Sequence, residues 1–348
     1  MRRLPVFFVL DCSESMVGEN LRKMEDGLQS VVRSLRMDPH ALESVYVSVI
    51  AFAGIAKTIA PLVEVASFYA PKLPLGGGTG LGAALETLMN EIDRSVIKTT
   101  ADTKGDWKPI VYLFTDGLPT DNPSSAIARW NVNYARKAKL IAVSLGKNAD
   151  FSTLKKLTEN VVVFEDSQEG DFTKFVKWIS ASVLAQSKSL CENLENSNVV
   201  FDESVMQVVK EQHPVVDETC VTLVGRCQTT RKPYLIKYEQ RINAVKTRDF
   251  RVDVENYHLA GCYPLEEDYF RWTQKDSPGL EVNTSSLVGS PGCPHCGNFT
   301  AFAVCGCGKL LCISGPGEAV CPWCETPVSF VAGASDKDSG FNVGRGQG

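Results

Sequence analysis

The stretch that decides the fold is residues 4–15, "LPVFFVLDCSES", in which an apolar run gives way to an acid and two serines. A continuous apolar run is typical of a central parallel strand that is buried on both faces of its sheet. The polar residues that follow are open to two interpretations. They form either a solvated turn or a set of oxygen ligands, Asp11, Ser13 and Ser15, directed at one metal ion.

The first 190 residues repeat this strand signature in alternation with helical patterns. Apolar residues recur at helical spacing in four later segments, which are 21–35, 81–96, 126–137 and 172–183. Strand-like segments lie between and beside them, at 44–54, 57–65, 109–117, 139–146 and 161–166. The first two of these strand-like segments are joined by a turn short enough for a hairpin. This alternation predicts an α/β fold with a doubly wound, mostly parallel sheet covered by helices on both faces.

Three loops at one edge of this predicted sheet carry oxygen ligands, because ligands of doubly wound sheets bind outside the carboxyl ends of the strands. Asp11, Ser13 and Ser15 follow the first strand, Thr79 lies in "PLGGGTGLG" before a helix, and Asp116 follows the strand at 109–117. Carboxylates and hydroxyls are hard donors that suit Mg²⁺ or Mn²⁺. The plainer alternative for Thr79 is a helix cap.

This pattern resembles the von Willebrand factor A domain and its metal-ion-dependent adhesion site. The family's first motif, Asp-x-Ser-x-Ser, is "DCSES" here, and its threonine and third-loop aspartate match Thr79 and Asp116. The resemblance covers about residues 4–190. It implies that the serine hydroxyls bind the ion directly and that the acids act partly through water. It also implies that a carboxylate from a partner fills an open coordination position.

A cysteine-rich stretch, "CPHCGNFTAFAVCGCGKLLCISGPGEAVCPWC", occupies residues 293–324. Its two C-x-x-C pairs have the spacing of zinc knuckles, whose four thiolates complete a closed tetrahedral shell of a structural kind. We expect all seven cysteines of the stretch near one or two Zn²⁺ ions: Cys293, Cys296, Cys305, Cys307, Cys312, Cys321 and Cys324.

The pairing of these thiolates stays open between two arrangements. A single site uses the two C-x-x-C pairs alone. A cross-braced pair of sites joins the first pair to Cys312 and the second pair to Cys305 and Cys307, and it lacks an eighth ligand. His258 or His295 are the candidates for that ligand, although a surface or core role is the more ordinary one for a histidine. Two cysteines further upstream, Cys220 and Cys227, are interpreted as buried thiols outside the cluster.

The chain divides into four predicted segments. The α/β domain occupies residues 1–190. It is followed by a β-rich intermediate region at 191–290, whose topology the sequence does not define. The zinc-binding module occupies residues 291–331, and a disordered tail occupies residues 332–348.

Composition narrows the partner classes and the compartment. A net charge of −5 gives no reason to expect a nucleic-acid partner, and no stretch is long enough to span a bilayer. The N-terminal apolar run is too short, and lacks the cleavage site, for a secretory signal. Without such a signal the cysteines are expected in a reducing, cytoplasmic compartment, where their crowding favours metal binding over disulfides.

The combination of "DCSES" with the later "CPHCG", "CGCGKLLC" and "CPWC" motifs resembles the TerY family of bacterial tellurite-resistance-associated proteins. That resemblance implies an adaptor without enzymatic activity in a stress or defence signalling system. The implied partners are a serine/threonine protein kinase and a PP2C-type phosphatase, with no nucleic acid and no membrane.

Three other functions remain as alternatives. The first is a RING-like ligase element, against which Lys309 counts because it stands where a histidine ligand is expected. The second is a metal-handling protein of tellurite resistance, and the third is a Mg²⁺-dependent phosphohydrolase. No residue is assigned a catalytic role, because the sequence has no G-x-S-x-G, no P-loop motif and no H-E-x-x-H.

Overall fold

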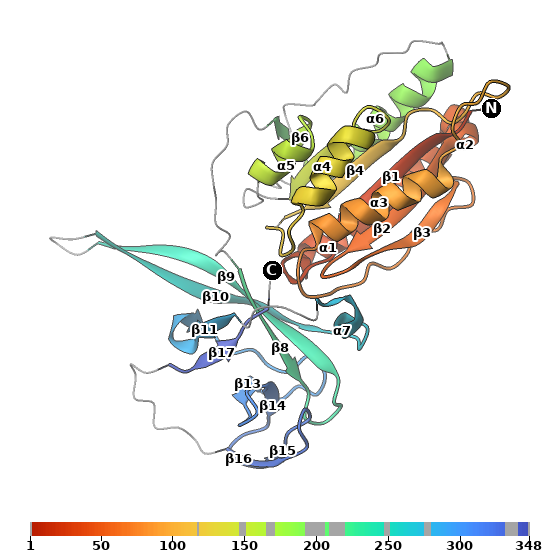
Figure 1. Ribbon diagram of the computed structural model, residues 1–348. Coiled ribbons are helices and arrows are strands. Elements are labelled where there is room, and N and C mark those ends of the chain that lie inside the picture. The colour runs from red at the N-terminus through yellow and green to blue at the C-terminus, as the bar shows by residue number, and fades with distance from the viewer. Residues whose placement is uncertain are drawn as a thin grey trace. The chain divides into compact units, whose positions relative to one another are not determined.

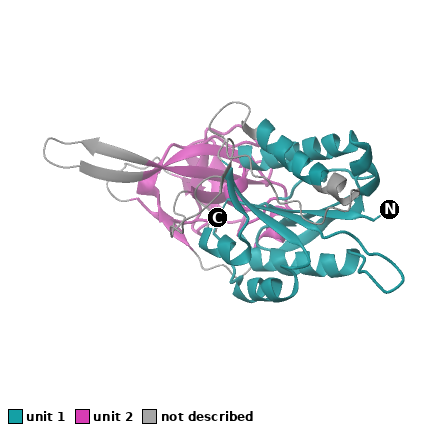
Figure 2. Cartoon of the chain, turned by 90° about the horizontal axis from the view of Figure 1, so that it is seen from above, with its two compact units in different colours: residues 1–12, 19–74, 79–216 teal, residues 13–18, 75–78, 217–348 magenta. Residues whose placement is uncertain are grey.

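The computed structural model describes residues 2–116, 118–145, 151–164, 171–191, 206–208, 220–246, 251–274, 280–330 and 340–346. The chain falls into two compact units, which Figure 2 distinguishes by colour. The first unit comprises residues 1–12, 19–74 and 79–216, and the second comprises residues 13–18, 75–78 and 217–348.

The first unit is built on a seven-stranded sheet in the order β3-β2-β1-β4-β5-β6-β7. Its strands are β1 (Leu4–Asp11), β2 (Val45–Phe52), β3 (Ala56–Glu64), β4 (Ile110–Thr115), β5 (Lys139–Leu145), β6 (Val161–Phe164) and β7 (Met206–Val208). Neighbours pair in parallel except at the two edges, where β3 and β7 run antiparallel. The predicted doubly wound, mostly parallel α/β fold is confirmed.

Six helices accompany this sheet in the described part of the first unit. They are α1 (Glu19–Arg36), α2 (Pro39–Ser44), α3 (Leu81–Ser95), α4 (Ser124–Asn133), α5 (Phe151–Leu157) and α6 (Asp171–Cys191). Successive residues of β1 face opposite layers, as strand geometry requires. Phe7 packs in the core shared with α3, α4 and α5, whereas Phe8 stacks on Tyr112, which contacts Trp178 of α6. Figure 1 shows α3 and α4 together on one side of the strands.

The position of β1 creates the feature that matters for function. Because β1 pairs with β2 on one side and β4 on the other, the strand order reverses at the β1–β4 boundary. Ligands of doubly wound sheets bind at such a switch point, outside the carboxyl ends of the strands. Asp11 is the last residue of β1, and Asp116 directly follows β4.

The second unit contains a six-stranded sheet in the order β12-β10-β9-β8-β14-β13. The strands of this sheet are β8 (Cys220–Arg226), β9 (Pro233–Lys246), β10 (Arg251–Pro264), β12 (Leu287–Val288), β13 (Thr300–Val304) and β14 (Leu310–Ile313). Two smaller sheets pair β11 (Glu281–Asn283) with β17 (Asn342–Gly344) and β15 (Gly317–Val320) with β16 (Pro327–Phe330). The short helices are η1 (Glu14–Met16), α7 (Tyr269–Trp272) and η2 (Thr284–Ser286).

Three expectations about the segments need correction. The predicted boundary at residue 291 is not a structural one, because β14 pairs with β8 in a single sheet. The predicted disordered tail over 332–348 contains an ordered strand, since Val343 of β17 is buried and pairs with Val282 of β11. The first sheet extends past residue 190, because β7 pairs with β6. Residues 331–339, 347 and 348 lie outside the described part.

Candidate metal centres

Asp11 is fully buried at the end of β1, and a hydroxyl from the neighbouring strand fixes its carboxylate. Thr115, the last residue of β4, donates from Oγ1 to Asp11 Oδ2 over 2.6 Å. One carboxylate oxygen is thereby oriented across the switch point. Asp116 follows Thr115 directly and is partly buried. Asp11 ends β1 and Asp116 directly follows β4, so the two carboxylates lie at the carboxyl ends of adjacent parallel strands.

Thr79 lies in the loop that leads into α3 and is 1% exposed. Among the described residues, its Oγ1 has no hydrogen-bond partner. Its backbone is held firmly, because Thr79 N donates to Thr120 Oγ1 over 2.8 Å and Thr120 N donates to Thr79 O over 2.9 Å. A buried hydroxyl without a partner is costly and needs a physical explanation. A metal ion that accepts an oxygen lone pair is such an explanation.

The alternative role for Thr79, a cap of α3, is not the one observed. The N-cap residue of α3 is Gly80, which has no side chain to accept from the helix. Instead, Asp121 Oδ2 accepts from Ala83 N over 3.1 Å, so a side chain from another loop caps the helix. A Cβ on Gly82 would lie 2.8 Å from this Asp121 oxygen, so a larger residue at this position would displace the side chain that caps the helix.

Ser13 and Ser15 belong to the second unit and lie next to each other there. Their Oγ atoms are 3.0 Å apart, and both side chains are buried. Two adjacent hydroxyl oxygens can coordinate one cation, because each keeps a lone pair when its proton points elsewhere.

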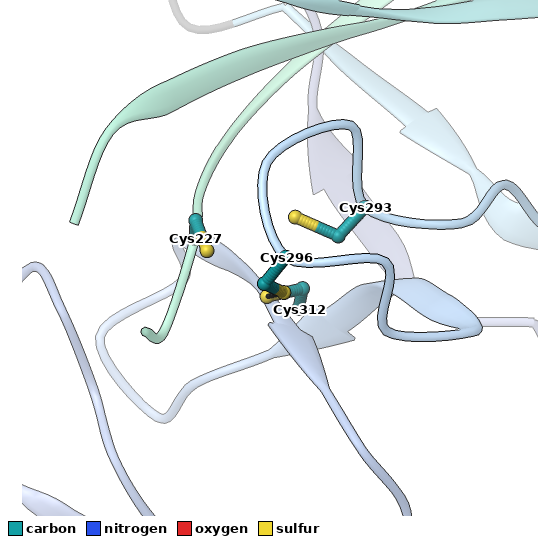
Figure 3. A group of neighbouring side chains, drawn as sticks. All are labelled: Cys227, Cys293, Cys296 and Cys312. Atoms are coloured by element: carbon teal, nitrogen blue, oxygen red, sulfur yellow. Dashed lines mark hydrogen bonds between the residues drawn. The ribbon is translucent and has the colours of Figure 1, made fainter. Parts of the chain in front are cut away.

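Eight cysteines of the second unit form two groups of four, and within each group the sulfur atoms lie within 4.8 Å of one another. Figure 3 shows the first group, with the side chains converging from separate segments of the chain. Cluster A is Cys227, Cys293, Cys296 and Cys312. Cluster B is Cys305, Cys307, Cys321 and Cys324.

Sulfur–sulfur distances in both clusters suit a tetrahedral metal. The Sγ atoms of Cys296 and Cys312 are 3.6 Å apart, and those of Cys305 and Cys324 are 3.7 Å apart. A tetrahedron with Zn–S bonds of about 2.3 Å has sulfur–sulfur edges of roughly 3.8 Å. From Cys293 onward the cysteines alternate between the clusters, with Cys293 and Cys296 in A, Cys305 and Cys307 in B, Cys312 in A, and Cys321 and Cys324 in B. This is the cross-braced arrangement considered from the sequence.

Cys227 completes cluster A, which corrects the expectation that it is a buried thiol outside the cysteine cluster. The turn at Cys227 has the geometry of the C-x-x-C turns: Arg231 N donates to Cys227 O, as Gly297 N does to Cys293 O. Thr230 stands where a second cysteine would complete a C-x-x-C motif, so the sequence does not mark this turn as a zinc knuckle. The available signal was the ligand count, which left the cross-braced arrangement one ligand short.

Neither histidine belongs to a cluster. His295 Nε2 lies 2.8 Å from the carbonyl oxygen of Pro233, so its ring is used in a backbone contact. His258 does not belong to either four-sulfur group of the described residues. Neither candidate therefore supplies a ligand to these two groups.

Thiol acidity differs strongly within cluster A. Burial raises the pKa of the Cys227 thiol, but hydrogen bonds from Thr230 outweigh it and lower that pKa to about 6. Burial and the nearby Cys293 raise the pKa of Cys312, although Gln228 N donates to its sulfur over 3.2 Å. Four thiolates this close repel one another, so they ionise together only around a cation.

In the second unit the fold brings together eight cysteines suited to metal binding. Comparison with known families specifies the class: a von Willebrand factor type A domain model matches residues 6–178, and a TerY-C metal binding domain model matches residues 217–348. The chain belongs to the TerY-type proteins, in which a von Willebrand factor A domain is followed by a metal-binding TerY-C domain.

Solved structures that resemble the chain are distant in sequence. Proximal thread matrix protein 1 from the mussel byssus is 18% identical, with 53% of this chain and 48% of that chain covered and a TM-score of 0.40. A second structure of that protein, with a zinc occupied MIDAS motif, has a TM-score of 0.35 at 18% identity, covering 51% and 46%. A von Willebrand factor type A protein from Catenulispora acidiphila is 14% identical, covering 81% and 61%, with a TM-score of 0.38.

The chain spans about half the length of the mussel proteins that it matches. Separately, among the described residues no helix combines the length and apolar character needed to cross a membrane.

Proposed function

We propose that this protein is a cytoplasmic adaptor without enzymatic activity, whose magnesium site captures an acidic group of a signalling partner. A protein-interaction or metal-handling role follows from the two matched domains. The identities of the ion and of the partner go beyond this role and are part of the proposal. The observation that carries the proposal is the buried, unpartnered hydroxyl of Thr79.

The ion would be held by Asp11, Ser13, Ser15, Thr79 and Asp116 as ligands, directly or through water. The hydroxyls and carboxylates are hard oxygen donors, so Mg²⁺ or Mn²⁺ fits better than a soft metal. The two carboxylates balance the double positive charge of Mg²⁺ and add no surplus negative charge that would repel an anion. An ion so held attracts a further anionic ligand from outside, and the carboxylate of a partner protein meets that need.

The two cysteine clusters would hold one Zn²⁺ ion each and serve a structural role. Each offers four sulfurs, which leaves no open position for a substrate or a catalytic water. Zinc bound in this way contributes to folding free energy. The folded second unit then offers a surface that contacts the same partner. This contact adds to the binding at the magnesium site, because a partner held at one contact has a high effective concentration at the other.

The TerY resemblance supplies the candidate partners: a serine/threonine protein kinase and a PP2C-type phosphatase of a tellurite-resistance-associated system. The test measures the affinity of each purified partner for the zinc-loaded protein, with and without Mg²⁺. We expect binding that requires Mg²⁺ and is lost in Asp11→Ala. The matched control is Asp102→Ala, which removes an exposed carboxylate from a turn and should bind as wild type does.

Partner binding that is equal with and without Mg²⁺, and equal in Asp11→Ala, would contradict the proposal. A point variant is preferable to a chelator here, because a chelator would also remove the metal from the cysteine clusters.

A further inference from the structure

The segment 13–18, which carries the two serines of the adhesion motif, is anchored within the second unit by Glu14. Glu14 lies between the two serines and is fully buried. Its carboxylate accepts a hydrogen bond from the hydroxyl of Tyr269, and its Oε2 accepts from Thr222 Oγ1 over 3.0 Å. A buried carboxylate is tolerated only with such donors, so these two hydroxyls hold the segment in place.

Further contacts fix the same segment. Lys237, which is 8% exposed, donates from Nζ to the carbonyl oxygen of Ser15 over 2.8 Å. Val17 packs in a buried cluster with Leu235, Leu265 and Tyr269. Residues from β8, β9 and α7 therefore determine where the Ser13 and Ser15 hydroxyls lie.

The residues that contact the segment are also close in sequence to the metal-binding cysteines. Thr222 lies on β8, and Cys227 of cluster A follows the end of that strand. Tyr269 is followed by Phe270, whose ring meets Trp323 edge-on at 5.9 Å. Trp323 lies within the C-x-x-C turn of cluster B. The serine segment and both clusters thus share β8 and α7 as supports.

We propose that Thr222, Tyr269 and Lys237 are positioning residues for the magnesium site, and that metal in the cysteine clusters and Mg²⁺ at this site strengthen each other's binding. This inference rests on the proposed function. The physical basis is linkage: if the folded second unit holds the serines in the arrangement that binds Mg²⁺, then bound Mg²⁺ favours the folded second unit by the same free energy.

The experiment titrates the zinc-loaded full chain with Mn²⁺ and follows free Mn²⁺ by its paramagnetic resonance signal. Mn²⁺ prefers oxygen ligands and competes poorly with Zn²⁺ for thiolates. The variants are Tyr269→Phe and Thr222→Val, each of which removes one donor to Glu14. The matched control is Tyr238→Phe: its buried hydroxyl donates to Gly289 O and does not touch the serine segment.

We expect the dissociation constant for Mn²⁺ to rise about tenfold in Tyr269→Phe and in Thr222→Val, because each loses a hydrogen bond to a charged group. Tyr238→Phe should bind as wild type does. A second readout is zinc retention against a chromophoric chelator: Mg²⁺ should increase it in wild type, and a given Mg²⁺ concentration should increase it less in Tyr269→Phe.

Unchanged Mn²⁺ affinity in both variants, or an equal loss in the control, would overturn the positioning role while leaving the magnesium site intact. If zinc retention in wild type does not change with Mg²⁺, the proposal that the two metals strengthen each other's binding is overturned. Failure of the wild-type chain to bind Mn²⁺ is a different result, because it would overturn the proposed function as well.

Discussion

Arg231 and Glu325 occupy the same position in two different metal-binding turns, and their side chains form an ion pair of 2.9 Å. Each residue lies four positions after a cysteine, Cys227 or Cys321. They are the two non-glycine residues with positive φ in the described part of the chain, at 58° and 60°. In the corresponding turn after Cys293 this position is Gly297, with φ of 77°. The turn therefore requires a left-handed backbone conformation at this position, whichever side chain the residue carries.

The first prediction concerns this backbone position. Gly297→Ala should destabilise the second unit by about 1–2 kcal/mol, which is the cost of left-handed backbone for a residue with a Cβ. No steric clash adds to this cost, since nothing lies within 4 Å of the new Cβ. Chemical denaturation of the zinc-loaded protein measures the change.

Glu325→Gly is the reciprocal variant. It relieves the same backbone strain and loses only an exposed ion pair, which is worth roughly 0–1 kcal/mol. We expect stability equal to wild type or slightly higher. A loss in Glu325→Gly as large as that in Gly297→Ala would show that the ion pair, and not the backbone, dominates at this turn.

The second prediction tests the eighth sulfur ligand. Wild-type protein should retain two zinc ions per chain, one for each four-sulfur cluster. Cys227→Ser should retain one firmly bound ion, because an alcohol replaces a thiolate in cluster A. Elemental analysis after dialysis against a weak chelator gives the stoichiometry. Cys220→Ser is the control, since Cys220 belongs to neither cluster, and equal zinc content in the two variants would exclude Cys227 as a ligand.

The third prediction follows from the unpartnered hydroxyl of Thr79. Thr79→Val is close to isosteric and removes a buried polar group that lacks a partner. Without added Mg²⁺, the variant should be about 1–3 kcal/mol more stable than wild type, because the desolvation cost disappears. With Mg²⁺ the ranking should reverse, since only wild type gains binding free energy. Urea denaturation at both conditions provides the comparison.

Thr87→Val is the matched control for Thr79→Val. The hydroxyl of Thr87 donates to Ala83 O within α3 and has no part in the proposed site. Its replacement should leave the Mg²⁺-dependent stabilisation unchanged. If Thr79→Val is destabilised without Mg²⁺ and still responds to Mg²⁺, the hydroxyl is neither unsatisfied nor a ligand.

The fourth prediction concerns the cap that Asp121 provides to α3. Asp121→Ala leaves Ala83 N without its acceptor and should destabilise the first unit by about 1 kcal/mol, as loss of a helix cap does. Asp121→Asn should restore most of the loss, because its amide oxygen can accept the same bond. Equal destabilisation by the two substitutions would indicate that the charge, and not the hydrogen bond, matters.

Much of the first unit could be predicted because its signals are local. The run from Leu4 to Leu10 is a continuous apolar segment, which is typical of a strand buried on both faces. Helix α5 was not predicted, because a segment from Phe151 to Leu157 is too short to show helical periodicity clearly. Strand β7 (Met206–Val208) is too short to show the alternation typical of a strand.

The second unit could be predicted less well because its organisation depends on contacts between distant residues. Cys227 joins cysteines more than sixty positions away, and no spacing rule connects them. Glu14 appeared in the sequence as an unassigned residue between two serines. Its role depends on Tyr269 and Thr222, more than two hundred positions later, and only the folded chain brings these together.

The most direct test of the central claim observes the ion while a partner binds. The proton relaxation enhancement of water measures how many water molecules remain on Mn²⁺ bound to the zinc-loaded protein. The account predicts that adding the purified kinase or phosphatase lowers this enhancement, because a carboxylate of the partner displaces a bound water. If both partners bind with the relaxation enhancement unchanged, the ion does not capture their acidic groups, and the account is contradicted.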